Sequence, residues 1–227
     1  MNNKAKIGVI ILISASAVGL LYPIIIGLPG QDEIVIPREA SKWHIGKGSE
    51  YNPTMFYDVT SADGIKFSAK IGFINDVSKK QIISVQFDDS VSGKKIEQRT
   101  SLSSAYTFGE VSEDAIPYFQ VLDKTIFSIR DTALEEKYLV KKAVWDTVFI
   151  GASTQELIVT EHEKISFAFG SADAFVLSYK IGNNENKFWI VDNLPLPVKA
   201  KVYDMNGNLQ YYYELTSLFA PRTPGFS

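Results

Sequence analysis

The chain of 227 residues contains no cysteine. This absence excludes disulfide bonds, thiol catalysis, cysteine-ligated zinc ribbons and a lipid anchor attached through cysteine. The fold must therefore be stabilised by packing, and a content of 45% hydrophobic and 12% aromatic residues supplies ample material for a core. The composition is that of a globular chain, and nothing in it marks an internal linker.

Histidine and clustered positive charge are scarce as well. The two histidines, His44 and His162, have no second ligand at metal-site spacing, so we interpret both as surface residues. A hydrolase would need one of them within hydrogen-bond reach of a serine or a carboxylate in the folded chain. The formal net charge is −3 and the lysines are scattered, which leaves no site for nucleic-acid phosphates. We expect no catalytic residues, no metal ligands, no cofactor and no nucleic-acid partner, and we predict that the protein is not an enzyme.

Two short motifs partly match known functional motifs, a calcium-binding loop and a catalytic serine motif. The run from Asp204 to Asn208 matches the first three ligand positions of a calcium loop, but Leu209 stands where its glycine belongs and Leu215 where its bidentate glutamate belongs. The run from Ser92 to Lys95 matches the Ser-x-x-Lys pattern of penicillin-recognising enzymes without their other motifs. We interpret both stretches as turns.

Residues 7–28 form an apolar stretch without a charge, and Lys4 and Lys6 precede it. As a helix it would be about 33 Å long, enough to cross the hydrocarbon core of a bilayer. The positive-inside rule then predicts a cytoplasmic stub (1–6), a transmembrane anchor (7–28) and an extracytoplasmic remainder, a single-pass protein of the cell membrane. The alternative is a signal peptide cleaved near Ala17, which would release a secreted domain.

The rest of the chain divides by composition. Residues 29–52 are polar and interrupted by proline and glycine, which predicts a stalk. Residues 53–218 are expected to form an extracytoplasmic β-rich domain, and residues 219–227 a disordered tail.

Strands are predicted wherever apolar and polar residues alternate at a period of two. The predicted strands are residues 56–60, 65–73, 81–87, 145–149, 155–160, 164–169, 174–181 and 188–191, followed by a hairpin over 198–215. Residues 90–107 are polar and are expected to form a loop, and turns are expected at 161–163 and 170–173.

The dipeptide Asn206-Gly207 fixes the register of the last hairpin, because Asn-Gly is the strongest short-range hairpin signal. With these two residues as the loop, the facing pairs are Val202 with Tyr211, Ala200 with Tyr213, Val198 with Leu215, Lys199 with Glu214 and Tyr203 with Gln210. One face of the hairpin is therefore apolar and needs to be covered.

A helical period interrupts the strands once. Phe119, Leu122, Ile126, Ile129 and Ala133 are three or four residues apart, which predicts a single apolar helix over about 115–130. The predicted fold class is mainly β (α+β): a curved antiparallel sheet, or half-barrel, wrapped around this one apolar helix, with an N-terminal transmembrane helix.

The C-terminal part of the chain carries a family resemblance. The runs that begin at Phe169 (FGSADAFVLSY), Phe188 (FWIV) and Leu194 (LPLPVK), followed by the Asn206-Gly207 hairpin, resemble LolA/LppX-like and DUF3108-like extracytoplasmic proteins over about residues 164–215. The resemblance implies a half-barrel with a helix across its concave face, which that superfamily uses for acyl chains and other hydrophobic ligands. The predicted anchor departs from the free or lipidated N-terminus of that group, and the organisation also resembles membrane-anchored archaeal surface proteins.

Aromatic and aliphatic side chains are the richest candidates for a binding surface, although the same residues can form the core. The residues expected to face a ligand are Phe119, Leu122, Ile126, Ile129, Phe175, Trp189, Tyr211 and Tyr213. The predicted function is binding of a hydrophobic, lipid-like ligand or of an envelope partner protein. The alternative is a structural or assembly component of a cell-envelope complex, without a small-molecule ligand.

Overall fold

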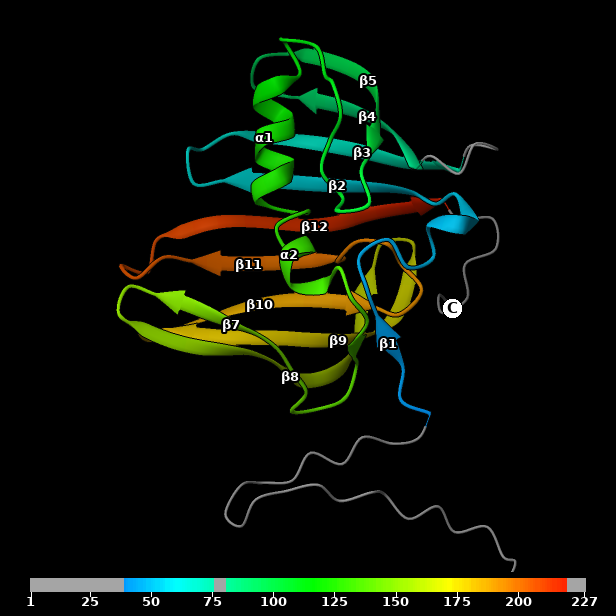
Figure 1. Cartoon of the computed structure of the whole chain (residues 1–227). Coiled ribbons are helices and arrows are strands. Elements are labelled where there is room, and N and C mark those ends of the chain that lie inside the picture. The colour runs from blue at the N-terminus through cyan, green and yellow to red at the C-terminus, as the bar shows by residue number, and fades with distance from the viewer. Residues whose placement is uncertain (1–38, 76–80, 220–227) are drawn as a thin grey trace, which may run out of the picture. The chain divides into compact units, whose positions relative to one another are not determined.

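The largest element of the fold is one curved antiparallel sheet of ten strands (Figure 1). In this computed structural model, residues 39–75 and 81–219 are described. The strand order is β5-β4-β3-β2-β12-β11-β10-β9-β8-β7. The strands are β2 (Thr54–Ser61), β3 (Lys66–Asn75), β4 (Gln81–Asp89), β5 (Lys94–Leu102), β7 (Val144–Ile150), β8 (Ser153–Phe167), β9 (Gly170–Ile181), β10 (Asn184–Val191), β11 (Lys199–Tyr203) and β12 (Leu209–Phe219). The prediction of a mainly β fold with a large curved antiparallel sheet is confirmed.

The remaining elements are short. A second sheet pairs β1 (Lys42–Trp43) with β6 (Lys137–Tyr138), and a 3-10 turn, η1, spans Ser49–Tyr51. The helices are α1 (Ile116–Lys124) and α2 (Arg130–Ala133), and both lie over one face of the large sheet, which we call the inner face (Figure 1). Within the described residues, no helix has both the length and the apolar character needed to cross a membrane. The predicted anchor (7–28) and the tail after Phe219 lie outside these residues.

Strand β12 joins the early and late parts of the chain. It pairs with β11 on one side and with β2 on the other, so that Tyr213 lies between Ala200 and Val59. All three residues are at most 2% exposed. The inner face is therefore continuous across segments that are about 150 residues apart in the sequence.

The hairpin register is confirmed for three of its predicted pairs, Val202 with Tyr211, Ala200 with Tyr213 and Lys199 with Glu214. Leu215 also donates its backbone N–H to Val198 O at 2.7 Å. The prediction for Tyr203 is wrong, since it pairs with Leu209 after a register shift. The loop is wider than two residues because the Asp204 carboxylate accepts the N–H groups of Asn206 and Asn208, each at 2.8 Å.

The prediction of one continuous helix is wrong, because the chain breaks the helix after Lys124. Thr125 Oγ1 donates to Val121 O at 2.7 Å, and Phe127 N donates to Leu122 O, five residues back, at 3.0 Å. This break turns Phe127 into the core, where it is 0% exposed, although it lies off the apolar stripe. The stripe itself is buried as its spacing indicates, and Phe119, Leu122, Ile126, Ile129 and Ala133 are all at most 3% exposed.

Two predicted loops are strands. Residues 94–102, expected in a loop, form β5 at the edge of the sheet, where only Ile96, Thr100 and Leu102 are buried. An edge strand with one solvated face carries few apolar residues, which hides it in the sequence. The turn expected at residues 161–163 is a register shift between Val159 and Glu161 inside the continuous strand β8. The turn expected at 170–173 lies instead at residues 168–169.

The second half of the predicted stalk belongs to the folded unit. Trp43 and Ile45 are 0% exposed. Trp43 Nε1 donates to Leu194 O at 2.8 Å, and its ring stacks on Trp145 with a centroid distance of 5.8 Å. Residues 39–52 therefore pack with the sheet, because two large apolar side chains outweigh the polar character of the segment.

We expect Trp43→Ala to lower the free energy of unfolding by about 3–5 kcal/mol, because it removes a buried ring and leaves Leu194 O without its donor. The measurement is guanidinium denaturation of the fragment that begins at Glu39. The control, Val91→Ala, changes a side chain that is 80% exposed and should stay within about 0.5 kcal/mol of the wild type. Equal effects of the two variants would show that residues 39–52 are not part of the core.

Candidate ligand-binding groove

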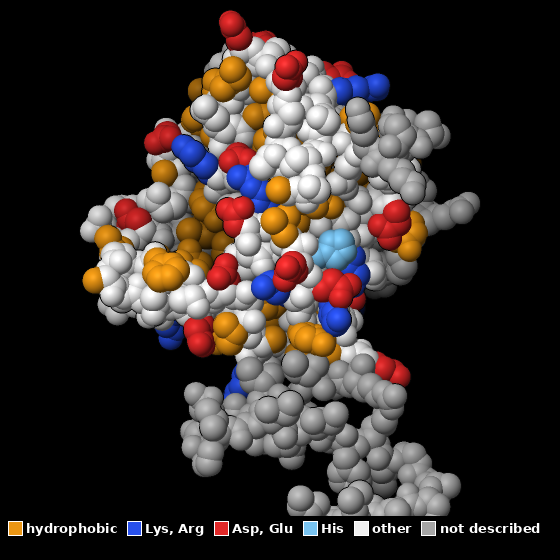
Figure 2. Space-filling view, in the orientation of Figure 1, with side chains coloured by type: hydrophobic (Ala, Val, Ile, Leu, Met, Phe, Trp, Pro, Cys, Tyr) orange, Lys and Arg blue, Asp and Glu red, His pale blue; other side chains and the backbone are white. Residues whose placement is uncertain are grey.

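The inner face is left partly uncovered beside α1, where a solvent-open cavity has a volume of about 760 Å³. We call this cavity the groove. Its floor comes from the sheet, one wall from α1, and the opposite wall from β7 and its turn. Figure 2 shows the corresponding recess, in which hydrophobic side chains gather on the side where β7 and the β11–β12 hairpin turn.

The residues of the groove come from segments far apart in the chain. The floor residues are Ser61, Tyr179, Ile181, Val202 and Tyr211; the α1 wall is Pro117, Gln120, Val121, Lys124 and Thr125; the β7 wall is Val148, Phe149, Ile150 and Gly151. Ala62, Asp63, Ile65, Tyr203, Asp204, Met205 and Gln210 form the rim at the tips of two hairpins. Apolar and aromatic side chains therefore outnumber the polar ones, and both kinds line the cavity.

Tyr211 is one of two tyrosines of the floor, with Tyr179. Its hydroxyl lies 3.2 Å from Ser128 Oγ, and its ring stacks in parallel with Tyr213 at 6.2 Å. Tyr213 in turn meets Tyr57 edge to face at 5.9 Å. Burial raises the pKa of each of these three phenols, so all three are neutral near pH 7, and the ring of Tyr211 adds an uncharged surface to the floor.

The polar and charged side chains of the groove are Ser61, Asp63, Gln120, Lys124, Thr125, Asp204 and Gln210. Ser61 Oγ is buried and has no hydrogen-bond partner within the described residues, and burial raises the pKa of the Tyr179 phenol. Lys124 is the single cationic side chain among the residues that line the groove. Of the two rim acids, Asp204 already accepts hydrogen bonds from Asn208 and Asn206, which lower its pKa.

The eight residues predicted to face a ligand do not form one site. Tyr211 lines the groove. Leu122, Ile126, Ile129 and Tyr213 are core residues with exposures of at most 3%. The spacing of these four residues in the sequence correctly indicates that they are buried. They are buried in the core and do not face the groove.

The other three predicted residues have different surroundings. Phe119 packs edge to face on Phe87 and Phe108 and borders a shallower hollow of about 360 Å³ beside α1. Phe175 stacks on His162 at 4.3 Å. Trp189 lies on the outer face, since its neighbours Phe188 and Ile190 point inward, and its Nε1 donates to Glu163 at 2.6 Å.

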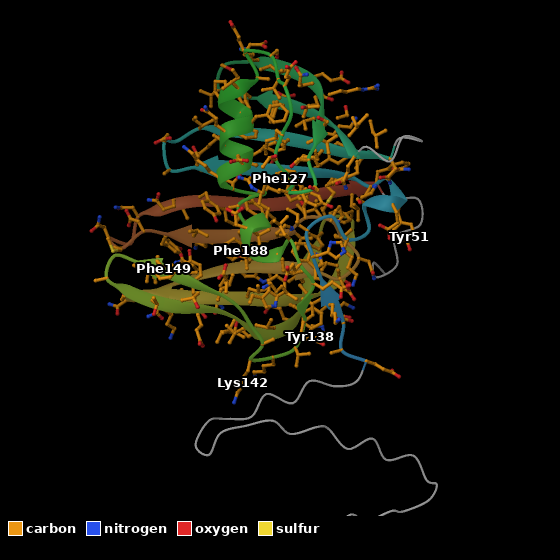
Figure 3. All side chains as sticks on the ribbon, in the orientation of Figure 1. Tyr51, Phe127, Tyr138, Lys142, Phe149 and Phe188 are labelled. Atoms are coloured by element: carbon orange, nitrogen blue, oxygen red, sulfur yellow. The ribbon has the colours of Figure 1, made fainter. Side chains whose placement is uncertain are left out.

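Most of the groove was not predicted from the sequence, including Ile181, Val202, Val148 and Phe149. The available signal was the position of these apolar residues next to hairpin turns, where a strand leaves the covered part of a sheet. Phe149 is the clearest case: it is 79% exposed although its strand is apolar, and Figure 3 shows it on β7 close to the turn into β8.

The histidines have ordinary surroundings. His44 Nδ1 lies 2.9 Å from Ile45 O, and the ring of His162 stacks on Phe175 as described above. Among the residues that the structure describes, no three histidine, aspartate or glutamate side chains are grouped to hold a metal ion.

No family model matches the chain, and no curated protein matches it significantly. Among solved structures, it is similar to MucB in complex with MucA(peri), with a TM-score of 0.47 and 11% identity over 79% of this chain and 54% of that chain. MucB alone gives a TM-score of 0.47 and 10% identity over 79% and 57%, and the Pseudomonas aeruginosa MucA/MucB complex gives 0.39 and 10% over 78% and 58%. The chain thus spans little more than half the length of these structures, none of which bears on the archaeal resemblance. Structural similarity at this level does not assign a function of MucB to this chain.

We expect the Tyr211→Phe variant to differ from the wild type in its response to alkaline pH. The pKa of Tyr211 is raised in the folded state, so the stability that this phenol contributes is present below about pH 10, the unfolded value, and is lost as the pH rises above it. Relative to the wild type, the variant should gain about 1.4 kcal/mol of stability for each pH unit above this point. Urea denaturation between pH 8 and pH 12 measures the difference. A difference that does not change with pH would show that the Tyr211 phenol ionises equally in both states.

Proposed function

We propose that the chain is a non-enzymatic, membrane-anchored extracytoplasmic domain whose groove binds the apolar part of a ligand or of an envelope partner. The observation that supports this most is an open groove of about 760 Å³ with an apolar floor at Ile181, Val202 and Tyr211. Its volume lies within the range of about 300–1,000 Å³ that is typical of small-molecule sites.

The chemistry of the groove indicates what it accepts. Apolar floor residues favour an acyl chain or aliphatic and aromatic side chains, and the exposed Lys124 ammonium supplies a polar contact. A nucleic acid does not fit, because phosphates need several cations and the lining offers one. Binding rather than catalysis is also supported by the surroundings of His44 and His162, which bond to a backbone carbonyl and stack on a ring.

The location of the domain is part of the proposal. It is supported by the uncharged run of residues 7–28, with Lys4 and Lys6 before it, for which the positive-inside rule predicts a cytoplasmic N-terminus and an extracytoplasmic groove. The alternative is secretion after cleavage near Ala17.

We expect protease added to intact cells or spheroplasts to digest the domain while a tag before Met1 stays protected, because the span separates the two. Immunoblots against the tag and against the domain measure this. Mass spectrometry of the purified protein distinguishes the alternative, since cleavage near Ala17 would remove the tag and the first half of the span. Protection of the domain in intact spheroplasts would contradict the proposed orientation.

We expect Ile181→Arg to weaken binding of the uncharged apolar dye Nile red to the fragment from Glu39 by about tenfold or more, because a charge on the floor must be desolvated by the bound dye. Fluorescence titration measures the affinity. The matched control is Val91→Arg, which adds the same charge at a side chain that is 80% exposed and lies outside the groove.

Equal dye affinities of these two variants would contradict the proposal that the groove binds an apolar ligand. Native mass spectrometry of the full chain then distinguishes the classes of ligand. A co-purified lipid favours a lipid-like ligand. A groove that binds neither dye nor lipid favours the alternative, a structural component of an envelope complex.

A further inference from the structure

The large sheet has two edge strands, and only one of them is protected against pairing with another chain. Strand β5 carries Lys94, Lys95, Glu97 and Arg99. Its C-terminal half is also covered by the chain that follows, since Gly109 N donates to Ser101 O at 2.9 Å and Leu102 forms a bridge with Phe108. Charged residues and a covering segment are the usual means by which proteins block an edge.

Strand β7 lacks both protections over its second half. Residues 147–150 (Thr-Val-Phe-Ile) contain no charge and no proline. The first half is closed: Asp146 Oδ2 accepts the Thr132 hydroxyl of α2 at 3.0 Å, and Asp146 Oδ1 accepts Thr147 N at 2.7 Å. The open part of the edge is therefore short and begins after Thr147.

The pairing of β7 with β8 shows which backbone groups are open. A two-residue loop, Gly151-Ala152, joins Ile150 to its partner Ser153. In such a hairpin, the backbone N–H and C=O groups of the residue next to the loop bond to the neighbouring strand. Those of the residue before it point away from that strand, and the two orientations then alternate along the strand. Thr147 and Phe149 therefore point their backbone groups away from β8, and the bond from Thr147 N to its neighbour's carboxylate agrees with this. The N–H of Phe149 has no such local acceptor among the described residues.

The open part of the edge coincides with the groove. Val148 and Ile150 line the β7 wall, and the α1 wall with Lys124 lies opposite. Phe149 borders the groove, and its side chain is 79% exposed (Figure 3). A strand laid beside β7 would thus present every second side chain to the apolar floor at Ile181 and Val202.

We propose that this edge accepts an extended segment of a partner protein, which adds a strand beside residues 147–150 of β7 and places alternate apolar side chains in the groove. The inference rests on the proposed function and specifies its ligand. Main-chain hydrogen bonds supply affinity in this mode of recognition, and pockets for alternate side chains supply specificity. The partner segment has apolar residues at every second position and an acidic residue that faces Lys124, which makes no ion pair within the described chain.

Two other occupants fit less well. An acyl chain would bury the N–H of Phe149 and the C=O of Thr147 without offering them a hydrogen bond, which makes a peptide the better match. A second copy would bring its own β7 with β8 bonded behind it, and a cavity of about 760 Å³ between β7 and α1 has room for one extended strand rather than a sheet.

The test selects peptides from a phage-displayed library of random octapeptides against the full chain in lipid nanodiscs, after removal of phage that bind empty nanodiscs. We expect the selected peptides to alternate apolar and polar residues at a period of two. Phe149→Pro removes the outward N–H at an edge position where proline is tolerated, and should weaken their binding by about tenfold or more. Phe149→Ala keeps the N–H and should weaken binding less.

The matched control lies at the other edge. Ser101 C=O points away from β4, and the backbone groups of Glu97, four residues earlier, point in the same direction. Glu97→Pro therefore removes an outward N–H from β5 and should leave peptide binding unchanged. Should Phe149→Pro fail to fold, Phe149→Lys tests the same edge by adding a charge, with the same expected loss.

Failure of the two proposals can be told apart. Selection of no peptide, or of peptides whose binding survives both Phe149→Pro and Phe149→Lys, would overturn the edge proposal. If dye binding still depends on Ile181 in that case, the groove remains a binding site for a lipid-like ligand. A concentration-dependent dimer that Phe149→Pro abolishes would also overturn it, in favour of a second copy.

Discussion

The inner face of the large sheet carries most of the apolar side chains and must be kept from water. Ten strands about 4.8 Å apart make a sheet about 43 Å wide, whereas the nine residues of α1 make a helix about 14 Å long. One helix therefore covers only part of this face, where Tyr118 and Phe119 pack on Phe67 and Phe87. The helix break at Thr125, the α2 turn and the stacked Trp43 and Trp145 cover the next part. The groove is the part that none of them reaches.

The groove and the open edge of β7 have the same cause, because the helices are too short to cover the whole inner face. Thr132 of α2 reaches Asp146 and closes the first half of this strand, and nothing in the described chain closes the second half. The strand edge and the apolar floor at Ile181 and Val202 are consequently exposed side by side. Backbone donors and acceptors next to apolar side chains are the combination that an extended peptide matches. At the opposite edge, the charged residues of β5 and the segment after Leu102 prevent an extended peptide from pairing with the sheet.

Much of the sheet could be predicted, and much of the site could not. Alternation at a period of two located β2, β3 and β4, and the register of β11 with β12 was predicted for Val202, Ala200 and Lys199. Strand β5 was missed because an edge strand needs few apolar residues, and the register shift in β8 resembled a turn. Of the eight residues expected to face a ligand, only Tyr211 lines the groove. Apolar character predicts burial equally for a core and for a binding surface.

By itself, the sequence determined the local features: the alternating strands, the apolar stripe from Phe119 to Ala133 and the pairing around Asn206-Gly207. These depend on interactions between residues close together in the chain, whose spacing is visible in the order of amino acids. Only the tertiary structure decided that Trp189 lies on the outer face, that Trp43 joins the core and that Val148 and Ile181 meet across a groove. The reason is geometric: the place where α1 stops covering the sheet depends on the width of the whole sheet, and no short stretch of sequence encodes that width.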